Sequence, residues 1–429
     1  MASWLNNAIF YEIYPQSFND SNGDGIGDFQ GIIDKLQYVR DLGCNAIWIN
    51  PCFDSSFYDA GYDVRDYYTA AERYGSNADL QRLFERAHEL GMHVLLDLVP
   101  GHSAVDNPWF LESGKDERNA WTDRYIWRPM TQSPNLNSPY ESIRGFLGGI
   151  AERPDAAAVN CFSTQACLNY GFGTVTEDWQ FAADSPEAVQ GRLLIQDIMD
   201  FWLGLGADGF RVDVAHGLAK DLDRDDLESY KVCEHVLPSD GSHPLYDRDE
   251  VHDIYREWRK VFNEYNPPAF AVAEAWVNPD RQHLYASTEE LGQVFNFEFA
   301  KKDWIRDDMH LAIEEGLESA ERSGSSATWV MSNHDVPRHA SRYGLPQVPA
   351  SSHHQLAKDW LLRDGTTYEE NRELGAKRAR AAILMELALP GSTYIYQGEE
   401  LGLPEVADIP WNKLEDPTAF NSVREQIEK

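Results

Sequence analysis

The sequence predicts an α/β fold, a (β/α)8 TIM barrel with a small domain inserted after the third strand. Short apolar runs, which are typical of parallel strands buried on both faces, alternate with segments whose apolar residues recur at helical spacing. Eight such strands over 429 residues favour a closed barrel over an open sheet. The alternation is interrupted once, by a stretch rich in Pro, Asn, Ser and Trp.

The elements follow one another in a regular order. The expected strands are residues 8–18, 46–51, 93–99, 209–214, 269–274, 294–299, 327–332 and 392–396. The expected helices are residues 29–42, 77–90, 187–203, 249–264 and 375–389. We therefore assign residues 1–100 and 173–429 to the barrel, and residues 101–172 to the inserted domain.

Composition excludes several classes of function. The 71 acidic residues outnumber the 37 basic residues and give a net charge of −34. This charge argues against binding to nucleic acid or to an anionic membrane surface, and favours a neutral or cationic ligand. Five cysteines without metal-type spacing indicate reduced thiols. No signal peptide and no apolar run of about 18 residues is present, so we expect a cytoplasmic protein without a membrane span.

The segment GFRVDV at residues 209–214 carries two opposite charges on one strand face. Arg211 and Asp213 are two residues apart, so their side chains point to the same side of the strand. The pair is either a structural ion pair or a nucleophilic carboxylate that its arginine keeps ionised. This segment alone does not decide between these interpretations.

Carboxylates follow three strands at the rim where a barrel enzyme places its catalytic groups. They are Asp213, Glu274 and Asp335. Two carboxyl groups around one pocket suit glycoside hydrolysis, in which one attacks the sugar and the other protonates the leaving oxygen. The apolar neighbours of Glu274 should raise its pKa, as a proton donor requires, whereas Arg211 should keep Asp213 ionised.

The loop at residues 20–28, DSNGDGIGD, has oxygen-bearing side chains at alternate positions. Such a loop resembles the first half of a calcium site, although no glutamate occupies the twelfth position. The alternative is a polar connection in which Asp28 caps the next helix. The density of oxygen ligands favours a structural calcium or magnesium ion.

Several segments together resemble the α-amylase superfamily, glycoside hydrolase family 13, and within it the α-glucosidase and oligo-1,6-glucosidase branch. The main segments are DLVPGH (97–102), GFRVDVAH (209–216), AEAW (273–276) and SNHD (332–335). The supporting segments are YEIYPQSF, DSNGDGIGD, DAGYDVRDY and YQGEELG. The resemblance covers nearly the whole chain, and the inserted stretch matches the superfamily's domain B.

The resemblance implies a retaining α-glucosidase that cleaves α-1,6 or α-1,4 bonds of short oligosaccharides. It implies that Asp213 is the nucleophile, Glu274 the acid and then the base, and Asp335 a ligand of the sugar hydroxyls. Val214 resembles the residue found in enzymes that cleave α-1,6 bonds. The implied sugar-binding residues are Asp59, Tyr62, His102, Arg211 and His334. The implied metal ligands are Asp20, Asn22, Asp24, Ile26 through its carbonyl, and Asp28.

The sequence also departs from the superfamily pattern. Gly101 replaces an asparagine that binds calcium in some relatives, so no metal is expected between barrel and inserted domain. The segment at residues 166–170 lacks the usual Pro and Asp. No antiparallel β-domain and no glucose-binding arginine follow the last strand before Lys429. A missing eighth helix would expose apolar barrel surface, so we expect self-association or poor stability of this chain alone.

Three other functions remain as alternatives. A transglucosylase or sucrose-active enzyme would use the same covalent intermediate and cannot be separated from a hydrolase by sequence. A non-catalytic relative, such as the heavy-chain subunit of an amino-acid transporter, would lack the carboxylates and carry a membrane span. A carbohydrate-binding module would need no acid and nucleophile pair. The retained carboxylates disfavour both non-catalytic alternatives.

Overall fold

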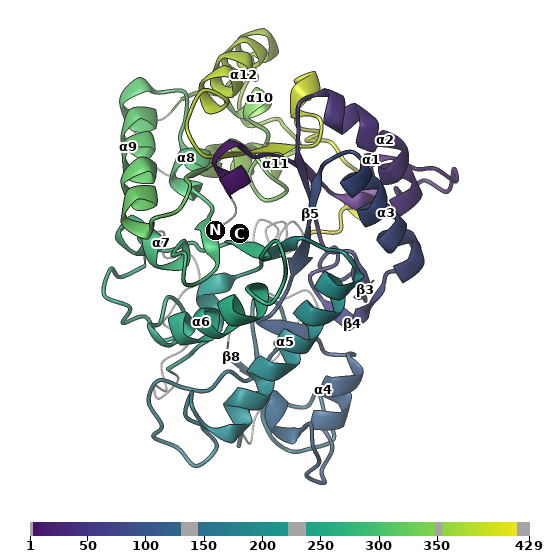
Figure 1. The fold of residues 1–429 in the computed structure, drawn as a ribbon, viewed down its shortest axis with the longest axis vertical. Coiled ribbons are helices and arrows are strands. Elements are labelled where there is room, and N and C mark those ends of the chain that lie inside the picture. Colours follow the sequence, from purple (N-terminus) through teal and green to yellow (C-terminus); the bar gives the residue numbers. More distant parts are fainter. Residues whose placement is uncertain (1–2, 130–144, 222–236, 348–353, 418–429) are drawn as a thin grey trace.

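The computed structural model describes residues 3–129, 145–221, 237–347 and 354–417 (Figure 1). Eight parallel strands form one sheet in the spatial order β13-β12-β11-β5-β2-β1-β15-β14. The strands are β1 (Ile9–Ile13), β2 (Ala46–Ile49), β5 (His93–Leu98), β11 (Gly209–Val212), β12 (Phe270–Ala273), β13 (Gly292–Val294), β14 (Thr328–Val330) and β15 (Ser392–Tyr396). The predicted (β/α)8 barrel is confirmed.

Strand β1 joins the N-terminal strands of the sheet to its two C-terminal strands. Phe10 of β1 is in register with Ala46 of β2 on one side and with Tyr394 of β15 on the other. Between β13 and β14, side chains bridge the remaining seam: the hydroxyl of Thr328 donates to the carbonyl of Val294 over 2.6 Å. The ring of strands is therefore nearly closed.

Helices surround the strands as an outer layer (Figure 1). The longer ones are α2 (Phe29–Asp41), α3 (Asn77–Glu89), α5 (Pro186–Leu205), α6 (Glu250–Phe262), α9 (Arg306–Ser323) and α12 (Arg372–Glu386). The shorter ones are α1 (Pro15–Phe18), α4 (Pro108–Ser113), α7 (Pro279–Tyr285), α8 (Phe297–Lys301), α10 (His339–Arg342) and α11 (His354–Leu361). Short 3-10 turns are η1 (Ser3–Asn7), η2 (Thr122–Arg124), η3 (Ala215–Gly217), η5 (Glu399–Leu401) and η6 (Trp411–Lys413).

The barrel interior is packed with large side chains. Phe10 and Tyr394 stack with ring centroids 4.3 Å apart, and Trp48, Leu95 and Val272 belong to the same buried cluster. Because these residues fill the centre, a ligand can be bound only at an end of the barrel.

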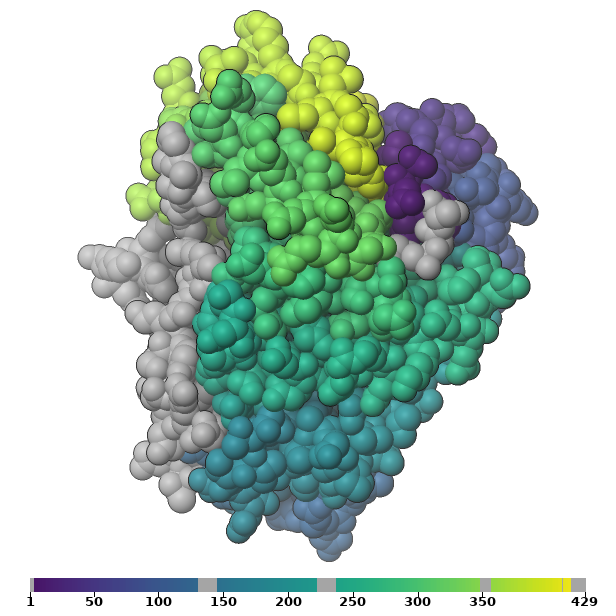
Figure 2. All heavy atoms as spheres, turned by 60° about the vertical axis from the view of Figure 1, so that its left-hand side comes forward, coloured from purple at the N-terminus to yellow at the C-terminus, as the bar shows by residue number. Residues whose placement is uncertain are grey.

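The stretch between β5 and β11 forms a small antiparallel sheet. Its strands are β6 (His102–Ala104), β7 (Trp127–Arg128), β8 (Gly145–Leu147), β9 (Ala156–Val159) and β10 (Gln165–Cys167). A hairpin of β3 (Phe53–Ser55) and β4 (Val64–Ala70) lies in the loop after β2. Figure 2 shows this inserted stretch, in blue, at one end of the molecule and the segment with α12, in yellow-green, at the other.

Some predicted elements were wrong in extent. The strand expected at residues 8–18 ends at Ile13, because Pro15 begins helix α1, where a proline is well tolerated. Of the strand expected at residues 294–299, only Val294 belongs to β13, and the second half lies in helix α8, whose start is capped by the side chain of Asn296. The β3–β4 hairpin and helices α4 and α9 were not predicted.

Two further observations concern the surface. No helix in the described part of the chain is long and apolar enough to cross a membrane. Leu384 and Leu401, near the end of the described chain, are 70% and 67% exposed. Self-association and a cytoplasmic location stay predictions.

Candidate active site

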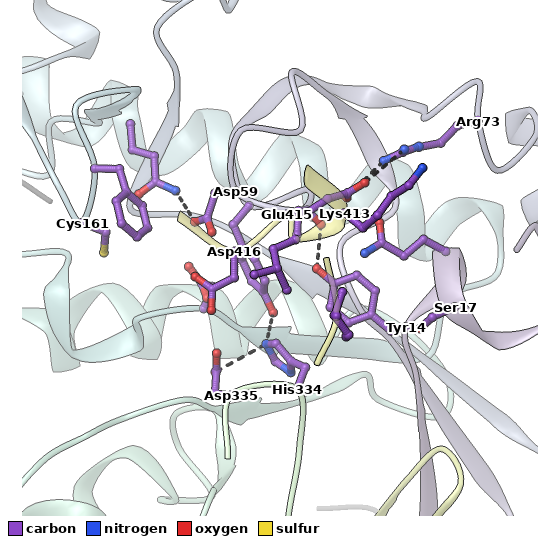
Figure 3. A pocket seen from close by; sticks show the side chains of 18 of the residues that line it. Tyr14, Ser17, Asp59, Arg73, Cys161, His334, Asp335, Lys413, Glu415 and Asp416 are labelled. Carbon is purple, nitrogen blue, oxygen red and sulfur yellow. Dashed lines mark hydrogen bonds and ion pairs between the residues drawn. The ribbon is translucent and has the colours of Figure 1, made fainter. Parts of the chain in front are cut away.

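A cavity of about 540 Å³ opens at the carboxyl ends of the barrel strands (Figure 3). It is lined by residues that come from distant parts of the sequence. The predicted site residues in its wall are Asp59, Tyr62, His102, Asp213, Val214, Glu274, His334 and Asp335. All predicted catalytic and sugar-binding residues except Arg211 therefore line this cavity. Arg211 is buried and contacts two of them, Asp213 and Glu274.

Arg211 is the buried centre of the site. Its Nη1 donates to Oδ1 of Asp97 and to Oδ1 of Asp213, each over 2.8 Å. Its Nη2 lies 2.8 Å from Oε2 of Glu274. Only 1% of Arg211 is exposed, so one cation serves three carboxyl groups in a low-dielectric environment. Burial outweighs the attraction of Arg211 and raises the pKa of Asp97 to about 6.

Glu274 directly follows β12, and its carboxylate accepts two hydrogen bonds in addition to its ion pair with Arg211. The backbone N–H of Val214 donates to its Oε2 over 2.8 Å, and the indole N–H of Trp276 donates to its Oε1 over 2.7 Å. Burial favours the neutral acid, but Arg211 and these two donors outweigh it and lower the pKa of Glu274 to about 2.

The expected raised pKa of Glu274 was therefore wrong. Its apolar sequence neighbours do not surround its carboxyl group, since successive residues of an extended chain point to opposite sides. Instead the carboxylate is satisfied by three donors from β11, the turn after it, and the segment after β12. Trp276 was predicted as one of the apolar neighbours that raise this pKa, whereas its indole N–H stabilises the carboxylate.

The expected low pKa of Asp213 was wrong as well. Burial raises the pKa of Asp213 well above its ordinary value, because Arg211 is shared and the carboxyl groups of Glu274 and Asp97 repel a second charge. Asp213 and Glu274 lie within hydrogen-bonding reach of each other. They therefore titrate as a coupled pair, whose pKa values belong to both carboxyl groups together.

Val214 has an uncommon backbone conformation. Its φ of 41° and ψ of 46° are left-handed, a region that β-branched residues rarely adopt. The turn ends β11 and directs the N–H of Val214 at Glu274. The side chain lines the cavity next to Asp213.

His334 is held between two acidic groups. Its Nδ1 lies 2.8 Å from Oε1 of Glu12, and its Nε2 lies 2.6 Å from the hydroxyl of Tyr62 and 3.4 Å from Oδ2 of Asp335. Burial opposes a charged imidazole, but Asp335 and Glu12 outweigh it and raise the pKa of His334 to about 9. His334 is thus an imidazolium at neutral pH.

Glu12 was not predicted as part of the site. It is fully buried in β1 beneath His334. A lone glutamate in an otherwise apolar strand, Ile9–Ile13, was the signal in the sequence that could have indicated it.

His102 is neutral, in contrast to His334. Burial lowers the pKa of His102 to about 4. Its Nε2 lies 3.0 Å from the carbonyl of Tyr62, which assigns the proton to that nitrogen. Its buried Nδ1 has no hydrogen-bond partner among the described residues.

Asp59 lies at the far side of the cavity from the strands (Figure 3). The amide of Gln165 donates to its Oδ2 over 2.7 Å. Burial raises the pKa of Asp59 well above its ordinary value, and the nearby carboxylates of Asp416 and Asp63 add to this effect. Gln165 and Asp416 were not predicted, because only the fold brings β10 and the chain after β15 to this wall.

The predicted metal loop lies beside the cavity, and Ile26 contributes to the cavity wall. All its candidate ligands are oxygens, which suits calcium or magnesium. The oxygens of Asp20, Asn22 and Asp24 accept hydrogen bonds from amides of the same loop, and Asp28 caps α2. The described residues contain no group of three or more His, Cys, Asp or Glu that could hold a metal ion.

Comparison with known proteins agrees with this geometry. Residues 12–368 match the family described as alpha amylase, catalytic domain. An oligo-1,6-glucosidase from Parageobacillus thermoglucosidasius is 31% identical over 99% of this chain and 70% of its own length. A trehalose-6-phosphate hydrolase from Bacillus subtilis (strain 168) is 30% identical over 99% of this chain and 70% of its length. A crystal structure of an α-glucosyl transfer enzyme superposes with a TM-score of 0.77 at 28% identity, covering 98% of this chain and 72% of the other.

Proposed function

This chain belongs to the alpha-amylase family of glycoside hydrolases, and we propose that it is a retaining α-glucosidase acting through a covalent glucosyl–Asp213 intermediate. Its substrates are short oligosaccharides with α-1,6 or α-1,4 bonds. The observation that carries the proposal is the shared guanidinium of Arg211, which binds Asp213 and Glu274 from its two Nη atoms. This arrangement favours the short carboxyl separation of retaining enzymes, about 5 Å, over the wider spacing of inverting enzymes.

The chemistry follows from the carboxyl pair. In the reactive state the pair holds one proton on Glu274, while Asp213 is ionised and stabilises the positive charge that develops at the sugar C1. Asp213 then bonds to C1, Glu274 gives its proton to the glycosidic oxygen, and the leaving sugar departs as a neutral alcohol. Water, deprotonated by Glu274, attacks C1 as the bond from C1 to Asp213 breaks, which releases glucose with retained configuration and restores the Asp213 carboxylate.

The remaining residues bind the glucose ring. Asp335 and Asp59 accept hydrogen bonds from sugar hydroxyls, and the charged His334 donates one. His102, which lines the cavity, is a further hydrogen-bonding partner for the sugar. Tyr62, fixed by its bond to His334, supplies a ring face on which the sugar stacks.

Transglucosylation is the second candidate. The similarity to an α-glucosyl transfer enzyme supports it, since a sugar hydroxyl can replace water in the second step. The ratio of transfer products to free glucose at rising substrate concentration distinguishes the two activities.

We also propose a structural calcium or magnesium ion in the loop of Asp20, Asn22, Asp24, Ile26 and Asp28. The oxygen chemistry of these residues supports the proposal. The ion would stabilise the loop at the cavity wall and would not enter the reaction.

Hydrolysis of a nitrophenyl α-glucoside, maltose and isomaltose tests the function. We expect release of glucose, and a loss of at least about 10⁴-fold in kcat in Asp213→Asn. Asp34→Asn, the same change on the outer helix α2, is the matched control and should retain activity. A folded wild-type chain that hydrolyses none of the three substrates would contradict the proposal.

A further inference from the structure

Glu274 accepts two hydrogen bonds for which the reaction above gives no role. They come from the backbone N–H of Val214, at 2.8 Å, and from the indole N–H of Trp276, at 2.7 Å. We propose that these two donors are positioning groups that strengthen Glu274 as an acid, by stabilising the carboxylate that remains after it protonates the leaving oxygen. This inference rests on the proposed glucosidase function.

The left-handed backbone conformation of Val214 directs its N–H at the carboxylate of Glu274. The amides on either side continue the strand pairing: Asp213 donates to the carbonyl of Leu98, and Ala215 donates to the carbonyl of Glu274, each over 2.9 Å. Of these three consecutive amides, the one of Val214 donates to a side chain, that of Glu274, instead of a backbone carbonyl. The left-handed conformation of Val214 turns the amide in this direction. A strained conformation at this point is typical of a functional constraint.

Trp276 is fixed just as firmly. Its indole stacks on Phe297 with ring centroids 3.8 Å apart and an interplanar angle of 3°. The ammonium of Lys301 lies 5.2 Å from the centre of the Trp276 ring and is paired with Glu298 over 2.8 Å. Helix α8 therefore holds the plane of the indole so that its N–H points at Oε1 of Glu274.

The two donors act on one defined proton transfer. The proton leaves Oε of Glu274 for the glycosidic oxygen as the bond from that oxygen to C1 breaks. The negative charge left on Glu274 is then shared with the amide and the indole, as in other charge-assisted hydrogen bonds. Without a donor the acid is weaker, and protonation of a poor leaving group becomes slower.

Other charged or titratable groups around Glu274 stay in place when Trp276 is changed. They are Arg211, Asp213, Asp97, His102, His216 and, behind the indole, Lys301. A shift in the pH profile can therefore be assigned to the lost N–H rather than to a lost charge.

The test compares Trp276→Phe with the wild type on two substrates. Isomaltose needs protonation of its leaving oxygen, whereas α-glucosyl fluoride releases fluoride without a strong acid. For isomaltose we expect kcat/KM to fall about 10- to 100-fold. We also expect the apparent pKa of the alkaline limb of its pH profile to rise by about one unit. For α-glucosyl fluoride kcat/KM should change less than about threefold.

Trp329→Phe is the matched control. It removes an indole N–H that donates to the carbonyl of Pro390 over 2.9 Å, away from the cavity. We expect it to leave the pH profile and the ratio between the two substrates unchanged. An ester in place of the amide at Val214 removes that N–H while keeping the side chain, and should reproduce the effect of Trp276→Phe.

The possible results distinguish a failure of this inference from a failure of the proposed glucosidase function. Equal losses on both substrates, or an unmoved alkaline limb in the two altered proteins, would show that Trp276 and Val214 act only on structure and would overturn the inference. A wild-type chain that cleaves neither substrate would overturn the glucosidase function itself.

Discussion

The hydroxyl of Tyr62 lies 2.6 Å from Nε2 of His334, and their rings are nearly parallel at 13°. On the other side of the imidazole, Glu12 binds Nδ1. The chain of Tyr62, His334 and Glu12 thus runs from the cavity wall to the buried first strand. It ties the loop after β2, the end of β14 and β1 into one network.

This network makes stability depend on pH. The folded pKa of His334, about 9, lies above the ordinary value of 6.5, so its stabilisation is complete below about 6.5 and is lost as pH rises through 9. Burial raises the pKa of Glu12 too, which acts in the same direction. We expect the free energy of unfolding to fall by on the order of 2 kcal/mol across this range.

Denaturant unfolding at pH 6 and pH 9.5 measures this effect. In His334→Gln the difference between the two pH values should shrink by most of that amount. His310→Gln, an exposed position on α9, should behave as the wild type. A wild-type stability that is equal at both pH values would contradict the charged state assigned to His334.

Val214 should influence linkage preference. Its side chain lines the cavity beside the nucleophile, where the leaving sugar must pass. We expect the wild type to prefer isomaltose, and Val214→Ala to raise the maltose-to-isomaltose ratio of kcat/KM by about tenfold, because the smaller side chain relaxes the fit. Initial rates on both disaccharides give this ratio, and an unchanged ratio would exclude Val214 as a determinant of linkage.

The proposed ion in the 20–28 loop predicts a thermal effect. Removing divalent ions with a chelator should lower Tm by roughly 5 °C, and added calcium or magnesium should restore it. Asp24→Ala should have the lower Tm and show no response to either treatment. If the chelator leaves Tm unchanged in the wild type, the loop is a polar connection without a metal.

The fold could be predicted because strand and helix periodicities are local. Strand β15 was predicted at its observed bounds, and β2 and β5 within two residues. Strand β13 was extended wrongly into Phe297–Lys301, since a short apolar run does not distinguish a strand from a buried helix. The hairpin of β3 and β4 depends on contacts within a long loop that no periodicity reveals.

The carboxylates proposed as catalytic could be placed at one rim from the sequence, but other residues of the site, such as Glu12, and the protonation of the carboxyl pair could not be predicted. Asp213, Glu274 and Asp335 each follow a barrel strand, so chain order and fold class suffice to place them at one rim. The pKa values of Asp213 and Glu274 depend instead on how Arg211 is shared and where the N–H groups of Val214 and Trp276 point. These are three-dimensional facts that neighbours in sequence do not contain.

Trapping the covalent intermediate tests the central claim most directly. Glu274→Gln with α-glucosyl fluoride should form the intermediate, because fluoride leaves readily, but should hydrolyse it slowly without a base. Mass spectrometry of the digested protein is expected to find one added glucosyl group on the peptide that contains Asp213, and none in Glu274→Gln combined with Asp213→Asn. Turnover by the wild type without any such adduct, or an adduct on another carboxylate, would contradict Asp213 as the nucleophile.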